Sequence, residues 1–137
     1  MTETIESDDA LLRRVKDDPN LWTEKGGELR VSRAAMSPHP EDQALSVDVR
    51  RLIPDPRDPL TAPSVVAGEV ADGVVELFAR AAERLGLAVK HEPLPENYAH
   101  ADITGFDQMR RKEAKRAQRE LAKTASWVRE PVSAAQT

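Results

Sequence analysis

Two histidines and an aspartate flank a short proline-containing turn in the second half of the chain. Alternating residues over 87–92 and 98–104 predict a β-hairpin around that turn. With a symmetric loop, His91 would lie across from His100, and Asp102 would share the same face. Two imidazoles and a carboxylate could bind a divalent cation or exchange protons near neutral pH, so these three residues are the candidate catalytic residues. A register shifted by one residue would instead separate the histidines onto opposite faces.

A basic segment near the C-terminus is the second candidate site. Residues 107–126 contain seven basic and three acidic side chains, a net charge of +4, whereas the whole chain has −4. Helical spacing over this segment brings most of the cations onto one strip. The candidate macromolecule-binding residues are Arg111, Lys112, Lys115, Arg116, Arg119 and Lys123. Such a strip could neutralise phosphates of RNA or DNA, or it could be a solvated face or one docked on the acidic body.

Two weaker constellations lie elsewhere. His39 stands with two acids on a proline-rich loop, which is a common location for sites. ADP-ribosyltransferase-like domains use Arg or His, then Ser or Tyr, then Glu, and a comparable order could be drawn from Arg13 or Arg14, Ser32, and Glu92 or Glu96. No linking motif accompanies these residues, so that order by itself implies little about function.

Composition restricts the chemistry further. Hydrophobic residues form 39% and charged residues 32% of the 137 residues, which predicts one domain with a small core. The sequence has no cysteine, which excludes disulfides and thiolate chemistry and favours a reducing, cytoplasmic location. Phosphate-binding loops, dinucleotide fingerprints, nucleophile elbows and paired-histidine protease motifs are missing from the sequence. We therefore predict no cofactor and no metal site of a known type.

The two ends of the chain are polar. Residues 1–9 carry four acidic side chains and no apolar run, so we expect a disordered N-terminus without a secretion signal. Residues 131–137 show no pattern and are expected to form a flexible tail. Nothing between them approaches the roughly 20 apolar residues that a membrane-spanning helix needs, so no membrane association is expected.

The predicted fold is a single α+β domain over 10–130, with about four mainly antiparallel strands packed on one long helix. Apolar residues at helical spacing indicate that helix over 64–85. Alternation and turn residues indicate the strands, over 28–36, 45–50, 87–92 and 98–104. The segment 10–16 fits a strand or a single helical turn equally well. The basic helix 107–126 completes the domain.

Five short stretches of the sequence resemble a group of small uncharacterised bacterial proteins of unknown function. They are Leu11 to Val15, Ser32 to Met36, Leu45 to Asp48, Pro93 to Ala101, and Leu121 to Val128. The resemblance implies a compact bacterial domain and transfers no catalytic residue. Met36 stands where that group is expected to have phenylalanine.

These observations favour a small non-catalytic interaction module, an accessory subunit that binds another macromolecule. Missing motifs and a small core suit such a protein better than one that organises a deep catalytic cleft. The net charge of −4 favours a protein partner over nucleic acid. Two alternatives stay open: a small enzyme or ligand-binding domain that uses His91, His100 and Asp102, and an RNA- or DNA-binding protein that uses the basic helix.

Overall fold

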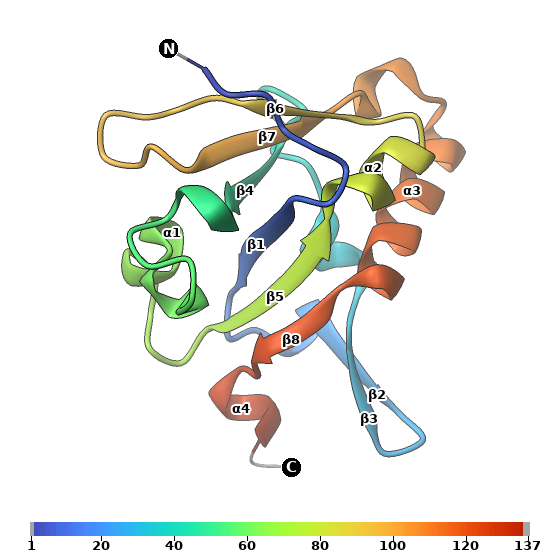
Figure 1. Ribbon diagram of the computed structural model, residues 1–137. Helices are drawn as coiled ribbons and strands as arrows, with labels where there is room; N and C mark the ends of the chain where they lie inside the picture. The colour runs from blue at the N-terminus through green and yellow to red at the C-terminus, as the bar shows by residue number, and fades with distance from the viewer. Residues whose placement is uncertain (1, 136–137) are drawn as a thin grey trace.

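A computed structural model describes residues 2–135, and its main feature is one antiparallel sheet of six strands (Figure 1). The strand order across the sheet is β6-β7-β4-β1-β5-β8. The strands are β1 (Ala10–Val15), β4 (Leu45–Val49), β5 (Gly73–Phe78), β6 (Ala88–His91), β7 (His100–Thr104) and β8 (Ser126–Arg129). A separate two-stranded hairpin is formed by β2 (Trp22–Lys25) and β3 (Glu28–Val31). The helices are α1 (Pro63–Val66), α2 (Ala79–Arg84), α3 (Arg111–Thr124) and α4 (Val132–Ala135).

The prediction of four strands on one long helix is wrong. The segment 64–85, predicted as that helix, contains the short helices α1 and α2 with strand β5 between them. Val74 and Val75 favour extended backbone because their branched side chains restrict χ1. Within residues 2–135, α3 is the only helix longer than two turns. The molecule is therefore a mostly sheet α+β fold.

Both faces of the central strands are buried, which explains why β5 does not alternate like a half-exposed strand. Val75 and Leu77 belong to the larger core cluster, together with Leu11 of β1 and Leu121 of α3. Val74 points to the other face and belongs to a smaller cluster. That smaller cluster also contains Leu12, Ile53, Ala62, Val65 and Ala99. A strand covered on both faces has a continuous apolar run instead of alternation.

Different elements cover the two faces. Helices α2 and α3 pack with β5, β6 and the 3-10 helix Arg33–Met36 on the side of the larger cluster. Helix α1 packs against β1 and β4 on the side of the smaller cluster. In Figure 1, α1 lies at the left of the sheet and α3 at the right. The predicted strands 45–50, 87–92 and 98–104 correspond to β4, β6 and β7, and the undecided segment 10–16 is β1.

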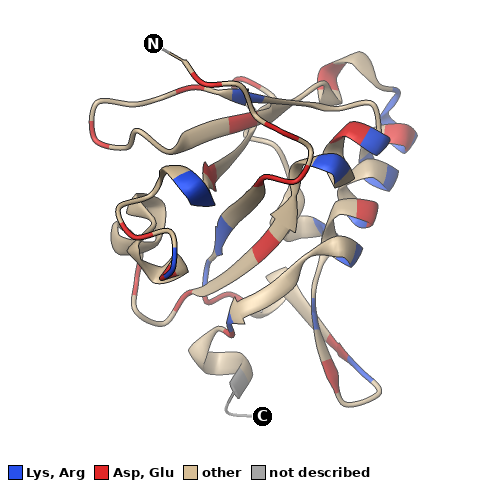
Figure 2. Cartoon of the chain, viewed as in Figure 1, with Lys and Arg blue, Asp and Glu red and all other residues tan. Residues whose placement is uncertain are grey.

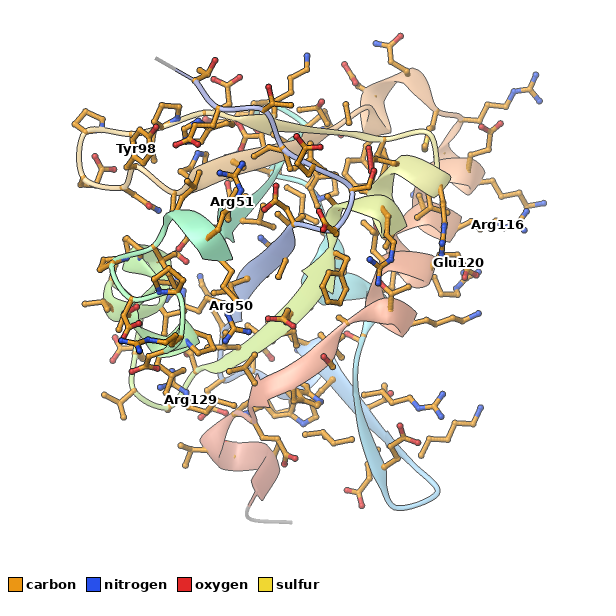
Figure 3. All side chains as sticks on the ribbon, viewed as in Figure 1. Arg50, Arg51, Tyr98, Arg116, Glu120 and Arg129 are labelled. Atoms are coloured by element: carbon orange, nitrogen blue, oxygen red, sulfur yellow. The ribbon has the colours of Figure 1, made fainter. Side chains whose placement is uncertain are left out.

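The acidic N-terminal segment runs beside the β6-β7 hairpin and makes specific contacts. Arg51 donates Nε to Asp9 Oδ1 at 2.8 Å and Nη1 to Glu3 Oε1 at 3.0 Å. The Tyr98 hydroxyl donates to the other Glu3 oxygen at 2.6 Å. Figure 3 shows Arg51 and Tyr98 on the side of the molecule where this segment passes. Met1, and residues 136–137 of the tail predicted as flexible, lie outside the described residues.

The turn from α1 into β5 is held by Asp72, a buried carboxylate. It accepts hydrogen bonds from the backbone N–H groups of Glu69 (2.9 Å) and Asp17 (3.0 Å) and from Arg14 Nη1 (3.0 Å). Burial raises the pKa of Asp72, but these N–H groups and the charge of Arg14 outweigh burial and hold the pKa below its usual value. Gly68 leaves the space that the Arg14 side chain occupies, since a Cβ there would collide with Arg14 Cδ.

Asp72→Asn is expected to destabilise the fold by about 1–3 kcal/mol near neutral pH, because the amide loses charge-assisted hydrogen bonds. A lowered folded-state pKa contributes stability above the unfolded value of about 3.9, and that contribution disappears as the pH falls through the folded pKa. The difference in unfolding free energy between wild type and Asp72→Asn should therefore shrink in acid. Urea denaturation of both proteins at a series of pH values measures it. A difference that stays constant down to the most acidic pH would contradict this role.

Candidate functional site

Helix α3 carries the predicted basic strip, and its apolar side attaches it to the core. Ala117, Gln118, Leu121 and Ala122 are buried. The helix begins at Arg111, later than the predicted 107, because Asp107 lies in a separate 3-10 helix, Phe106–Gln108. Apolar and small residues at spacings of three and four are typical of a helix docked by one side, which leaves the charged side in solvent.

All six candidate cations of α3 are exposed. Lys123 pairs with Glu120 at 3.2 Å. The other five have no carboxylate within 4.0 Å in residues 2–135. Figure 2 shows basic and acidic turns alternating along the outer side of α3, and Figure 3 shows Arg116 and Glu120 pointing away from the sheet. Most of the positive charge of the helix is therefore available to a partner.

A groove separates α3 and β8 from the β2-β3 hairpin. We call it the hairpin groove; its volume is about 820 Å³. Trp127 of β8 lines this groove and donates Nε1 to the Leu29 carbonyl at 3.1 Å, which fixes the hairpin against the sheet edge. Val31, Ala122 and Ala125 also line the groove. The floor of the hairpin groove is thus partly apolar.

The walls of the hairpin groove are cationic. Its basic residues are Lys25, Arg30, Arg33, Arg119 and Lys123. Glu28 is the one carboxylate among the lining residues, and it pairs with Arg30 at 3.1 Å. Arg33 also lines a second hollow, nearer the start of α3, together with Arg111 and Lys115. We call the six α3 cations together with Lys25, Arg30 and Arg33 the basic face.

Sequence reasoning missed the hairpin contribution to this face. Gly26 and Gly27 both have positive φ, of 60° and 80°, and join β2 to β3 directly. A Gly-Gly pair between two short strands is typical of a two-residue hairpin turn. That signal indicates a hairpin over 22–31, and strand alternation would then place Lys25 and Arg30 on the same face of it. It gives no sign that Trp127 would attach the hairpin beside α3.

The structure does not bring the histidines of the predicted cluster together. In the β6-β7 pair, His91 lies opposite Ala101, so that His91 and His100 project from opposite faces. His91 is buried: its Nδ1 accepts from the Glu3 N–H at 2.8 Å, and its Nε2–H donates to the Tyr98 carbonyl at 2.6 Å. Both ring nitrogens of His91 are thereby occupied, one by the N-terminal segment and the other by the β6-β7 connection.

His100 and Asp102 do share a face, with 3.5 Å between Nε2 and Oδ1. Burial raises the pKa of Asp102, the positive charge of protonated His100 opposes that rise, and Asp42 and Glu92 add to it. His39 is exposed on its loop and accepts from the Glu41 N–H at 3.2 Å. Within the described chain, no group of three His, Cys, Asp or Glu side chains is placed to hold a metal ion.

The order suggested by ADP-ribosyltransferase-like domains is not assembled either. Ser32 donates its hydroxyl to the Asn20 carbonyl at 3.0 Å. Glu92 and Glu96 are exposed on the β6-β7 hairpin. Across residues 2–135, no hydrogen bond or ion pair joins these groups to Arg13 or Arg14.

Comparisons of the chain with protein-family models, curated proteins and solved structures found no match. Any functional assignment therefore depends on the geometry of the molecule itself. Among residues 2–135, no helix has the length and apolar character required to cross a bilayer.

Proposed function

We propose that the protein is a non-catalytic interaction module whose basic face binds an acidic segment of a protein partner. The observation that supports this proposal is the hairpin groove, in which cationic walls stand over a partly apolar floor. Five α3 cations lack a carboxylate partner in the described residues, so binding an acidic segment would not first require internal ion pairs to break.

Two features favour an acidic protein segment over nucleic acid. Single-stranded nucleic acid is usually bound on several exposed aromatic rings, whereas Trp127 is the one aromatic residue lining the groove and its Nε1 is already engaged. The protein as a whole has a net charge of −4, which opposes the long-range attraction of a polyanion. A short peptide with alternating acidic and apolar side chains complements both the walls and the floor.

Arg119→Glu tests the proposal most directly, because Arg119 lies both on α3 and in the hairpin groove. A fluorescein-labelled peptide of alternating Glu and Leu should bind the wild-type protein. We expect the variant to weaken binding about tenfold, which corresponds to about 1.4 kcal/mol. Fluorescence anisotropy over a salt series measures the affinity. Arg57→Glu is the matched control, since Arg57 is 95% exposed and belongs to a different surface.

Three results would overturn the proposal. Equal weakening by Arg57→Glu would indicate general charge attraction with no defined site. Tighter binding of a single-stranded RNA with the same number of charges, with a steep salt dependence, would indicate a nucleic-acid-binding surface instead. Absence of binding by either probe would remove the basic face as an interaction surface. Affinity capture from cells, with and without nuclease and with Arg119→Glu in parallel, would then identify the natural partner.

A further inference from the structure

The six-stranded sheet is split along part of its length between β1 and β4. These strands pair at Leu11↔Val49 and Leu12↔Asp48 and no further. Beyond that point β1 continues its pairing with β5, while β4 continues with β7. The strands diverge where Arg13 would otherwise face Val47, and the opening is a cleft of about 250 Å³. We call it the strand cleft.

Arg13 occupies the point of divergence. Its Nε donates to the Ala35 carbonyl at 2.8 Å and its Nη1 to the Ser46 carbonyl at 2.7 Å. These two bonds use only part of a guanidinium group that has five N–H donors. In the part of the chain that the structure describes, no carboxylate lies within 4.0 Å of it. Burial, and then the charge of Arg14, lowers the pKa of Arg13 to about 10.

Further donors and cations line the strand cleft. Lys16 is exposed at its rim and has no carboxylate within 4.0 Å in residues 2–135. Arg14 lies beside it, with one Nη held by Asp72 at 3.0 Å. His100 also borders the cleft, and its Nδ1 lies 2.8 Å from the Glu92 carbonyl. Positive side chains therefore approach the opening from the β1 side, with His100 on the opposite side.

One carboxylate, that of Asp48, lines the strand cleft, but its oxygens are already occupied. Oδ1 accepts from Asn97 Nδ2 at 2.7 Å, and Oδ2 accepts from both the backbone N–H and the hydroxyl of Ser64. Asp48 has no exposed surface. Asp48 is therefore held by Ser64, which also lines the cleft, and by Asn97, and it does not pair with Arg13. The remaining wall includes apolar side chains of Val15, Leu21, Ala35 and Val47.

We infer that the strand cleft binds the phosphoryl group of a small phosphate ester. Arg13 and Lys16 would supply the charge, and the apolar wall would contact the organic part of the ligand. Two cationic side chains without a carboxylate partner suit a group that carries nearly two negative charges, whereas a carboxylate carries one. Arginine is the side chain best suited to bidentate recognition of phosphate, because its planar donors match the phosphate oxygens. This ligand site is independent of the basic face, which lies on α3 and the β2-β3 hairpin.

Titration with phenyl phosphate tests this inference, with inorganic phosphate and benzoate as comparisons. Two-dimensional ¹H–¹⁵N NMR should show the Arg13 Nε–H resonance shifting with saturation. Lys16→Gln is expected to weaken phenyl phosphate binding about fivefold without altering the fold, because Lys16 is exposed. Lys112→Gln, the same change on α3, should leave the affinity unchanged. Arg13→Lys should weaken binding more strongly than Lys16→Gln, provided that its circular dichroism spectrum matches wild type.

Other outcomes would overturn the inference. Shifts confined to α3, or equal weakening by Lys112→Gln, would indicate diffuse attraction to the basic face. Binding of benzoate as tightly as phenyl phosphate would show a carboxylate site, not a phosphoryl site. No response to any phosphate at millimolar concentration would show that Arg13 serves only to join the diverging strands. None of these results depends on whether the basic face binds an acidic peptide.

Discussion

Replacing Asp48 with alanine is expected to lower the free energy of unfolding by about 3–5 kcal/mol. The fully buried carboxylate joins three separate parts of the fold: strand β4, the start of α1 through Ser64, and the β6-β7 connection through Asn97. Alanine would leave the buried Asn97 amide and the half-buried Ser64 N–H without their acceptor. A buried donor that loses its partner costs its full desolvation energy, which is why the effect should exceed that of an ordinary hydrogen bond.

Urea denaturation followed by circular dichroism measures this change, and Asp8→Ala provides the matched control. Asp8 is exposed, so the same substitution there should alter stability by no more than about 0.5 kcal/mol. Asp48→Asn should recover part of the loss, because it keeps one acceptor oxygen. If Asp48→Ala lowered the free energy of unfolding no more than Asp8→Ala does, the contacts from Ser64 and Asn97 would not hold these three segments together.

The role of Asp48 also shows what strand alternation can and cannot predict. The alternating pattern over 45–50 identified β4 correctly and placed Asp48 on the polar side. That side does not face solvent, because the segment that contains Ile53, Ala62 and Val65 covers it. Periodicity gives the two faces of a strand but does not say which later segment will pack on the polar one. A buried acid therefore looks like an exposed acid in the sequence.

The error over 64–85 has a related physical cause. Helical spacing of apolar residues and a buried central strand both produce dense apolar runs, so spacing alone does not separate them. Gly73 and the Val74–Val75 pair were the local signals for extended backbone. Gly73 also allows a close approach, since a Cβ there would lie 2.8 Å from Trp127 and Pro131. That second requirement comes from residues more than fifty positions away, and no local pattern could reveal it.

The candidate sites differ in how much of their geometry is local. The cations of α3 follow from helical periodicity, and the structure places all six in solvent. The relation between His91 and His100 depends on the register of the β6-β7 pair, which a proline-containing loop does not fix. The strand cleft depends on where β1 and β4 stop pairing. Features that depend on the periodicity of one helix or strand were therefore predictable. Features that depend on how two strands pair were not.

Leu121→Ala is expected to lower the free energy of unfolding by about 3 kcal/mol, within the range for truncating a buried leucine. Leu121 has no exposed surface and belongs to the larger core cluster, through which α3 attaches to the sheet. A helix of 14 residues is only marginally stable alone, so the position of α3 depends on this docking. The substitution removes no charge, yet it should weaken binding of the acidic peptide, because the walls of the hairpin groove would no longer be held at a fixed spacing.

Leu60→Ala is the matched control, since Leu60 is 38% exposed and lies far along the chain from α3. Leu60→Ala should lower the free energy of unfolding by less than about 1 kcal/mol and leave the affinity for the acidic peptide unchanged. Urea denaturation and fluorescence anisotropy of the same two variants separate the two effects. If Leu121→Ala destabilised the fold but bound the peptide as tightly as wild type, the basic face would act as a set of independent charges. Loss of both properties would show that the sheet presents α3 and the hairpin as one rigid binding surface.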